Sequence, residues 1–147
     1  GLTVGSPNLI ERLETGLKSY NADMTIESDP FEAGLEKFID LDKPAEYMSR
    51  DALRKIAATG PARRLVNLVI EGAKLGALRS DWRVLDEDGE QIGLVTSQAY
   101  SPKYEANIAF ATVRSSHAGI GASVTVDADG DMRRAIVHDS QWRLPGG

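Results

Sequence analysis

Residues 122–137, "ASVTVDADGDMRRAIV", alternate between apolar and polar side chains on both sides of an Asp-Gly pair. Alternation with a period of two is typical of a β-strand with one buried face, and Asp-Gly between two such runs indicates a tight hairpin. The stretch therefore predicts two antiparallel strands joined at Asp129-Gly130.

The same pattern extends backwards along the chain as far as Arg63. Three more β-rich runs are separated by Gly, Asp and Pro: "RRLVNLVIEG" (63–72), "WRVLDEDGEQIGLVTS" (82–97) and "NIAFATV" (107–113). A second Asp-Gly pair, Asp88-Gly89, predicts another hairpin. Many short strands in succession are typical of an antiparallel sheet closed into a small barrel, which we expect over residues 61–147.

Residues 1–60 have a helical rather than a strand period. A first helix is expected from a Ser6 cap and Pro7, with apolar residues at helical spacing at Leu9, Ile10, Leu13, Leu17 and Tyr20. A second helix is predicted over 49–60, "SRDALRKIAATG", capped by Ser49 and stopped by Gly60. The sequence thus predicts an α+β chain, with a helical segment at 1–60 and a β-barrel domain at 61–147.

Composition narrows the classes of function. The 147 residues are 41% hydrophobic and 27% charged, which is typical of a soluble globular protein. The absence of cysteine excludes disulfides, thiolate metal sites and a thiol nucleophile. A net charge of -5 argues against a nucleic-acid partner, and no apolar run approaches the roughly 18 residues of a membrane span. We therefore expect a cytoplasmic protein that binds neither nucleic acid nor membrane.

Motifs for metal or nucleophilic chemistry are missing from the pattern. "DEDGE" and "DADGD" resemble calcium loops, but neither has the closing glutamate, so hairpin turns are favoured. "GIG" at 119–121 lacks the third glycine of a dinucleotide fingerprint and predicts a turn. His117 and His138 lie outside any ligand cluster in sequence. We assign no catalytic residue and no metal ligand.

The first predicted helix carries one unusual feature. Arg12, Gly16 and Tyr20 recur every four residues along the border of its apolar stripe. Glycine inside a helix costs about 1 kcal/mol relative to alanine, which suggests that something approaches the helix closely. One interpretation is packing over Gly16, with Arg12 paired to an acid such as Glu11 or Glu14. The other is a flat anionic ligand lying over the gap, and the pattern leaves both open.

Longer motifs resemble a known family. "PNLIERLETGLKSYNADM" (7–24), "DPFEAGLEKFIDLDKPAEYMSRDAL" (29–53), "GLVTSQAYSP" (93–102) and "NIAFATV" resemble the tetrahydrofolate-dependent aminomethyltransferases, which include the glycine cleavage T-protein. Within that family they are most similar to the dimethylsulfoniopropionate demethylase branch. The resemblance implies that residues 1–60 end a folate-binding domain and that 61–147 form the C-terminal barrel. It also implies a preceding region, absent here, that holds the catalytic aspartate.

The resemblance assigns cofactor-binding residues by position. Arg12 and Tyr20 match the arginine and tyrosine of the family motif "R-LEAGL--YG", and Trp142 and Arg143 match a looser C-terminal folate contact. Lys37 stands where glycine cleavage members carry tryptophan, which puts their aminomethyl substrate in doubt.

The implied activity is transfer of a one-carbon group from a methylated small molecule to N5 of tetrahydrofolate. The expected partners are that methyl donor, the preceding region of the same enzyme and further copies of the chain; this chain alone is expected to be inactive. Two alternatives remain open at this point: the folate domain of a sarcosine or dimethylglycine dehydrogenase, and a non-catalytic folate-binding or assembly module.

Overall fold

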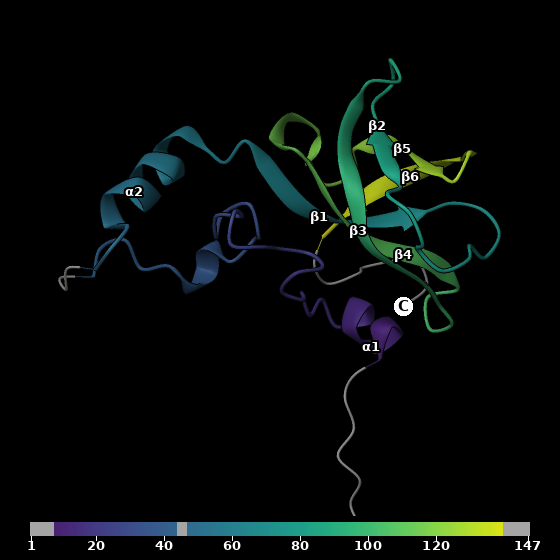
Figure 1. The fold of residues 1–147 in the computed structure, drawn as a ribbon, viewed down its shortest axis with the longest axis horizontal. Coiled ribbons are helices and arrows are strands. Elements are labelled where there is room, and N and C mark those ends of the chain that lie inside the picture. The colour runs from purple at the N-terminus through teal and green to yellow at the C-terminus, as the bar shows by residue number, and fades with distance from the viewer. Residues whose placement is uncertain (1–7, 44–46, 140–147) are drawn as a thin grey trace, which may run out of the picture.

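The computed structural model describes residues 8–43 and 47–139. Their main feature is a closed barrel with the strand order β1-β4-β3-β2-β5-β6, in which every neighbouring pair is antiparallel (Figure 1). The predicted antiparallel barrel is confirmed. Its strands are β1 (Arg63–Ile70), β2 (Arg83–Leu85), β3 (Gln91–Ser101), β4 (Ala106–Arg114), β5 (Ser123–Ala128) and β6 (Asp131–His138).

Both predicted hairpins are present. In β5–β6, Ala128 pairs with Asp131, and Asp129 and Gly130 have φ values of 58° and 91°. Two positive φ angles make this the type I′ turn whose twist matches that of the strands. The Asp88-Gly89 pair lies in the loop that joins β2 to β3.

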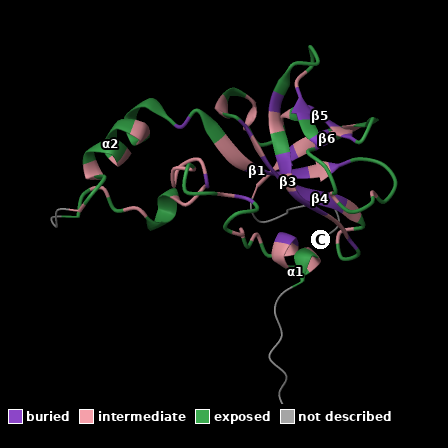
Figure 2. Cartoon of the chain, viewed as in Figure 1, coloured by how far each residue is buried: buried purple, intermediate pink, exposed green. Residues whose placement is uncertain are grey.

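The barrel interior is filled by apolar side chains that alternate along the strands, as the period of two requires (Figure 2). Gly93 on β3 allows β4 to approach closely, because a Cβ atom there would lie 2.1 Å from the carbonyl oxygen of Thr112. The buried residues of this core include Val66, Leu68, Ile70, Trp82, Val84, Ile92, Val95, Ala109, Ala111, Val113, Val124, Val126, Ala135 and Val137.

The first helix, α1 (Leu9–Glu14), is shorter than predicted. The side chain of Asn8 caps the helix by accepting from the backbone N–H of Glu11, and the Glu11 carboxylate accepts from the backbone N–H of Asn8. Ser6 and Pro7, the predicted start of the helix, lie outside the described residues. At the other end Gly16 has a φ of 73°. Its N–H donates to the Leu13 carbonyl, and the next N–H donates to the Arg12 carbonyl.

These two bonds form a Schellman motif, so Gly16 ends the helix. The prediction that Arg12, Gly16 and Tyr20 form one line along a continuous helix is therefore wrong. The glycine is explained by the left-handed conformation that the chain needs after α1. It does not indicate a gap left for a ligand.

The second predicted helix is present as α2 (Arg50–Thr59), and it projects away from the barrel (Figure 1). Gly60 ends it as predicted, with its N–H donating to the Ile56 carbonyl. Ser49 is the N-cap residue as predicted, but it has a φ of 78° and its side chain makes no capping hydrogen bond. A short 3-10 helix, η1 (Glu36–Phe38), lies between α1 and α2, and another, η2 (Ser115–His117), follows β4. Within the described part of the chain, every helix is too short or too polar to cross a membrane.

Candidate functional site

Helix α1 lies against the outside of the barrel, on β3 and β4 (Figure 1). Leu13 is completely buried there and packs with Ile108 and Phe110 of β4 in a small apolar cluster separate from the barrel core. Leu13 is flanked in sequence by two charged residues, Arg12 and Glu14. Each of them reaches a different polar group of the barrel, so α1 is fixed at three successive positions.

A bulge in β3 lies on the barrel side of the contact that Arg12 makes. The pairing of β3 with β4 shifts register between Val95 and Ser97, so Thr96 is an additional residue with no directly opposite residue on β4. A bulge interrupts the alternation of faces and redirects side chains. As a result, the hydroxyl groups of Thr96 and Ser97 both reach the same carboxylate, that of Asp23.

Asp23 lies at the centre of a buried polar group that we call the Asp23 cluster: Arg12, Asp23, Thr96 and Ser97. One carboxylate oxygen accepts from Arg12 Nη1 at 2.5 Å and from the backbone N–H of Ser19 at 2.8 Å. The other accepts from the hydroxyls of Thr96 at 2.8 Å and Ser97 at 2.6 Å. The Asp23 side chain has no exposed surface, and these four donors replace the water it has lost.

The Arg12 guanidinium is held from two directions. Nη1 donates to Asp23, and Nη2 donates to the Ser97 hydroxyl at 2.8 Å. A guanidinium has five N–H groups, so three remain without a bond to any residue of the described ranges 8–43 and 47–139. The side chain keeps 15% of its surface exposed. Arg12 is therefore oriented by the protein while it retains donors for another acceptor.

Glu14 makes the second polar contact of α1 with the barrel. The hydroxyl of Ser101, a fully buried residue at the end of β3, donates to Glu14 at 2.5 Å. The same hydroxyl oxygen accepts from the backbone N–H of Tyr104 at 3.1 Å. This contact fixes α1 without touching the Asp23 cluster.

Lys18 joins the chain after α1 to the turn before η1. Its ammonium donates to the carbonyl of Ala33 at 2.5 Å and more weakly to that of Gly34 at 3.4 Å. Burial lowers the pKa of Lys18 below its ordinary value, because desolvation disfavours the charged form, while Glu36 nearby acts in the opposite direction.

The sequence-predicted site residues have different fates. Arg12 belongs to the Asp23 cluster, whereas Tyr20 lies outside it and is 57% exposed. Trp142 and Arg143 lie outside the described residues. Sequence reasoning missed Asp23, Thr96 and Ser97, because no side-chain pattern marks the bulge in β3 that brings the two hydroxyls to Asp23.

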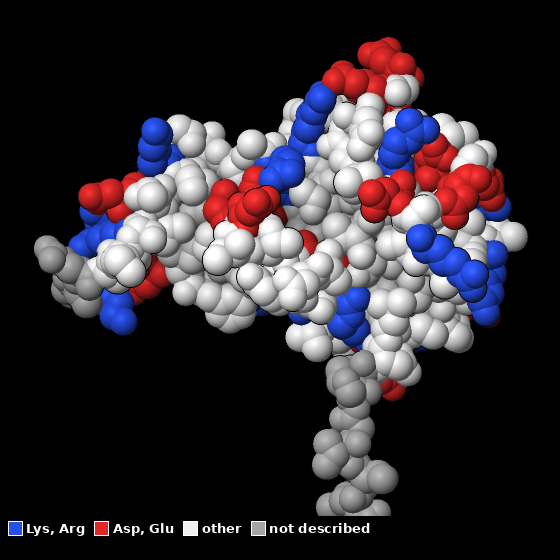
Figure 3. Space-filling model, viewed as in Figure 1, with Lys and Arg blue, Asp and Glu red and all other residues white. Residues whose placement is uncertain are grey.

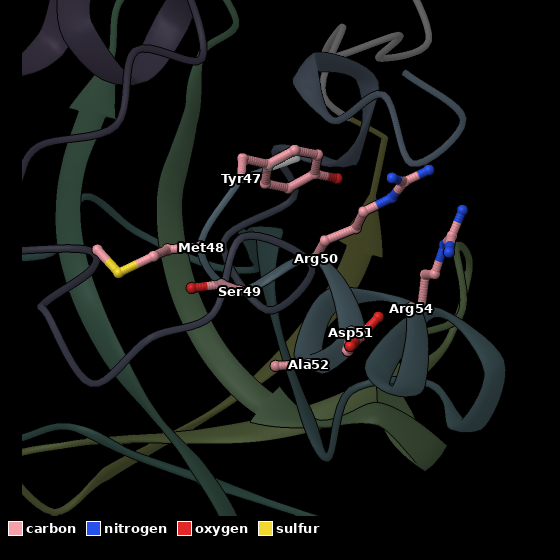
Figure 4. Close-up of a pocket in the computed structure, with 7 residues that line it drawn as sticks. All are labelled: Tyr47, Met48, Ser49, Arg50, Asp51, Ala52 and Arg54. Atoms are coloured by element: carbon pink, nitrogen blue, oxygen red, sulfur yellow. The ribbon is translucent and has the colours of Figure 1, made fainter. Parts of the chain in front are cut away.

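Outside the Asp23 cluster, the described residues offer a cavity and no metal-binding group. Across residues 8–43 and 47–139, no three acidic or histidine side chains gather in a metal-binding group. A cavity of about 510 Å³ lies at the start of α2, away from the Asp23 cluster, and no predicted site residue lines it (Figure 4). Its lining residues are Tyr47, Met48, Ser49, Arg50, Asp51, Ala52 and Arg54.

The described part of the helical segment, residues 8–43 and 47–60, exposes several large apolar side chains. Ile26, Phe38 and Met48 are the most exposed, at 88%, 75% and 94% of their surface. Leu9, Leu17 and Tyr20 are also exposed. Figure 3 shows a largely uncharged area across the lower part of this segment.

A family profile described as the glycine cleavage T-protein C-terminal barrel domain matches residues 63–142, which include all six strands. The chain belongs to this family. The predicted family resemblance is thereby confirmed. The match begins at the first residue of β1, so in this chain the family's barrel is preceded by the helical segment that contains Arg12 and Asp23.

Individual members of the T-protein family match beyond the barrel. A dimethylsulfoniopropionate demethylase of Ruegeria pomeroyi is 40% identical over 139 residues, which are 95% of this chain and 37% of that protein. An aminomethyltransferase of a Synechococcus strain is 40% identical over 126 residues, covering 86% of this chain and 34% of the relative. The chain thus spans little more than a third of the length of these relatives.

A solved T-protein structure has the same fold. The crystal structure of the glycine cleavage system aminomethyltransferase T from Bartonella henselae superposes with a TM-score of 0.79 at 26% identity. It covers 88% of this chain, whereas this chain covers 36% of it. The shared fold therefore includes most of the helical segment as well as the barrel.

Proposed function

We propose that this chain is the C-terminal portion of a tetrahydrofolate-dependent methyl- or aminomethyltransferase. The observation that carries the proposal is Arg12, which the Asp23 cluster orients while leaving three of its N–H groups uncommitted. The family membership and the match to a demethylase over 95% of the chain support it. In this proposal residues 1–60 close a folate-binding domain and residues 61–147 form the barrel beside it. A cytoplasmic location stays a prediction from the sequence.

The residues of the chain fit a folate ligand in one specific way. A planar guanidinium suits carboxylate or carbonyl oxygens, because two parallel N–H bonds can meet them. Arg12 would hold the cofactor by such charge-assisted bonds, and the exposed ring of Tyr20 would offer a flat apolar contact and one hydroxyl. Trp142 and Arg143 stay in the proposal as further contacts. When bound, tetrahydrofolate supplies N5 as the acceptor of the one-carbon group.

The contribution of these residues is to binding and orientation. Placing acceptor and donor within reach of each other converts a bimolecular encounter into a reaction within one complex. The described residues show no group that we assign as general base, so proton transfer is proposed to belong to the preceding region of the longer enzyme. The chain alone should therefore be inactive.

The proposal is tested by titrating tetrahydrofolate calorimetrically into a longer enzyme that carries this chain. Arg12→Lys keeps a positive charge opposite Asp23 but loses the fork of N–H groups, and we expect about tenfold weaker binding. Arg54→Lys on α2 is the matched control and should bind like the parent. Equal affinity of the Arg12 variant and the parent would show that Arg12 does not bind the folate.

The preceding region of the same enzyme is the proposed partner of the exposed apolar side chains. The relatives have nearly two thirds of their length outside the match, and their barrel is C-terminal, so that length precedes it. Ile26, Phe38 and Met48 would then be covered by this region. We expect the isolated chain to self-associate in sedimentation velocity, and triple replacement of the three residues by serine to restore a monomer.

For the one-carbon donor, we propose a methylated small molecule. The demethylase matches 95% of this chain against 86% for the aminomethyltransferase, and Lys37 replaces the tryptophan of glycine cleavage members. Assaying the longer enzyme with dimethylsulfoniopropionate and, in parallel, with aminomethylated glycine cleavage H-protein decides between them. Ammonia release from the carrier protein would assign the chain to the aminomethyl branch.

A further inference from the structure

We propose that Asp23, Thr96 and Ser97 are positioning residues for Arg12, through which the bulge of β3 controls the affinity of Arg12 for its ligand. The inference rests on the proposed function, because it takes Arg12 as the ligand-binding group. It adds a role for the barrel and for an acid that neither the family profile nor the sequence motif assigns.

The geometry of the cluster fixes the plane of the guanidinium. Both terminal nitrogens of Arg12 are bonded, Nη1 to Asp23 and Nη2 to Ser97. Two anchors at different nitrogens prevent rotation about the bond that carries the guanidinium. A single ion pair would permit that rotation.

Ser97 closes the cluster into a ring. Its hydroxyl oxygen accepts from Arg12 and its proton is donated to Asp23, while Asp23 accepts directly from Arg12. Each of the three groups thus determines the orientation of the other two. Thr96 adds a second hydroxyl to the carboxylate, so the Asp23 side chain is also held from the barrel side.

The cluster is poorly explained by stability alone. Leu13 already fastens α1 to the barrel by complete burial against Ile108 and Phe110. A buried ion pair adds little net stability compared with apolar side chains of the same volume, because both charges lose their water. What the cluster adds is a fixed orientation of the Arg12 guanidinium, which is determined by Ser97 of β3 and by Asp23.

The chain provides a matched pair of variants for a test. Ser97→Ala removes one anchor of Arg12, whereas Ser101→Ala removes the other buried β3 hydroxyl that fastens α1, through Glu14, and leaves every partner of Arg12 in place. Both variants are made in the longer enzyme, and tetrahydrofolate affinity and melting temperature are measured for each. We expect Ser97→Ala to weaken binding roughly tenfold and Ser101→Ala to leave it unchanged.

A double-mutant cycle then shows whether Ser97 acts through Arg12. In an Arg12→Lys background, Ser97→Ala should weaken binding by less than twofold, since the orientation that it maintains is already lost. A tenfold loss that persists in this background would overturn the inference. Equal losses in the Ser97 and Ser101 variants would do the same, because they would show a general effect of loosening α1.

The outcomes separate this inference from the proposed function. Weak tetrahydrofolate binding by Arg12→Lys together with normal binding by Ser97→Ala would contradict the positioning role of Ser97 and leave Arg12 as a folate-binding residue. Normal binding by Arg12→Lys would sink the site itself, and the inference with it. Asp23→Asn keeps a side chain of the same shape and removes the charge of the other group that anchors Arg12. Its tetrahydrofolate affinity is measured in the same way.

Discussion

The hydroxyl of Ser101 and the carboxylate of Glu14 meet at 2.5 Å, joining the end of β3 to the last residue of α1. Leu13 lies between this contact and that of Arg12 with the Asp23 cluster. Three consecutive residues of a six-residue helix are therefore fixed to the barrel. A helix this short is marginal by itself, so its order depends on these tertiary contacts.

The end of α1 provides the first prediction. Gly16→Ala places a Cβ atom on a residue with a φ of 73°, a conformation that costs an L-residue about 1 to 2 kcal/mol. We expect a loss of about that size in the free energy of unfolding, measured by urea titration. Gly76→Ala is the control, because a Cβ there meets nothing within 4 Å; equal effects of both variants would contradict the role of Gly16 as helix end.

The second prediction concerns the close approach of β3 and β4. A Cβ at Gly93 would lie 2.1 Å from the Thr112 carbonyl oxygen and 2.9 Å from the Val113 Cα. Both are main-chain atoms of a barrel strand, so neither can move without disturbing the barrel. Gly93→Ala should cost about 3 kcal/mol or prevent folding. Gly119→Ala, which meets no atom within 4 Å, should melt like the parent.

The third prediction is that a substitution at Gln98 stabilises the fold. Gln98 pairs with Ala109 of the barrel core and is 2% exposed, and among the described residues neither its amide nitrogen nor its amide oxygen has a hydrogen-bond partner. A buried polar group without a partner costs about 1 to 3 kcal/mol. Gln98→Met, with a side chain of similar length, should therefore raise the free energy of unfolding by about 1 kcal/mol.

Gln91→Met at the exposed start of β3 is the control for that experiment, and it should change stability by less than about 0.5 kcal/mol. If Gln98→Met destabilises the chain, the amide has a partner in solution, and the site needs a polar side chain.

The fourth prediction concerns acid sensitivity at β2 and β5. The hydrogen bond from Arg83, helped by the N–H of Gly130, lowers the pKa of Asp127 below its ordinary value of 3.8. A carboxyl group whose pKa is lowered by folding stabilises the fold above its unfolded pKa and loses that contribution as pH falls through the folded value. Asp127→Asn should therefore lower the melting temperature at pH 6.

At pH 3 the difference between Asp127→Asn and the parent should be smaller than at pH 6, because the parent loses the contribution of the charged carboxylate as the pH falls through the lowered pKa of Asp127. Calorimetric melting at both pH values checks this prediction. A difference that grows as the pH falls would show that the charge of Asp127 does not stabilise the pairing of β2 with β5.

The barrel was predictable from the sequence because its signals are local. Alternation marks a strand within a few residues, and the Asp-Gly pairs at 88–89 and 129–130 mark the turns. The end of α1 was missed because Leu17 and Tyr20 continue the helical spacing although the helix has stopped at Glu14. Gly16 after Thr15 could have indicated the end of the helix, but the helical spacing of Leu17 and Tyr20 favoured a longer helix.

The Asp23 cluster was beyond such reasoning for a different reason. Arg12 and Asp23 lie 73 to 85 residues before Thr96 and Ser97 in the sequence, and the bulge in β3 lets both of these hydroxyls reach the Asp23 carboxylate. No pattern of side chains reveals a bulge whose purpose is to turn two neighbouring hydroxyls to one face. Arg12 could be identified by family resemblance, whereas its partners needed the register of β3 against β4.

The bulge lets β3 hold one more residue than its ladder with β4 has places. If Thr96 took a regular place in that ladder, every residue after it would exchange faces. Gln98 would then leave the barrel interior, Ala99 would enter it, and Ser101 would turn away from Glu14. The outer surface of β3 that α1 contacts therefore depends on one residue staying outside the ladder, and a deletion of Thr96 would keep that surface while removing one hydroxyl from the Asp23 carboxylate.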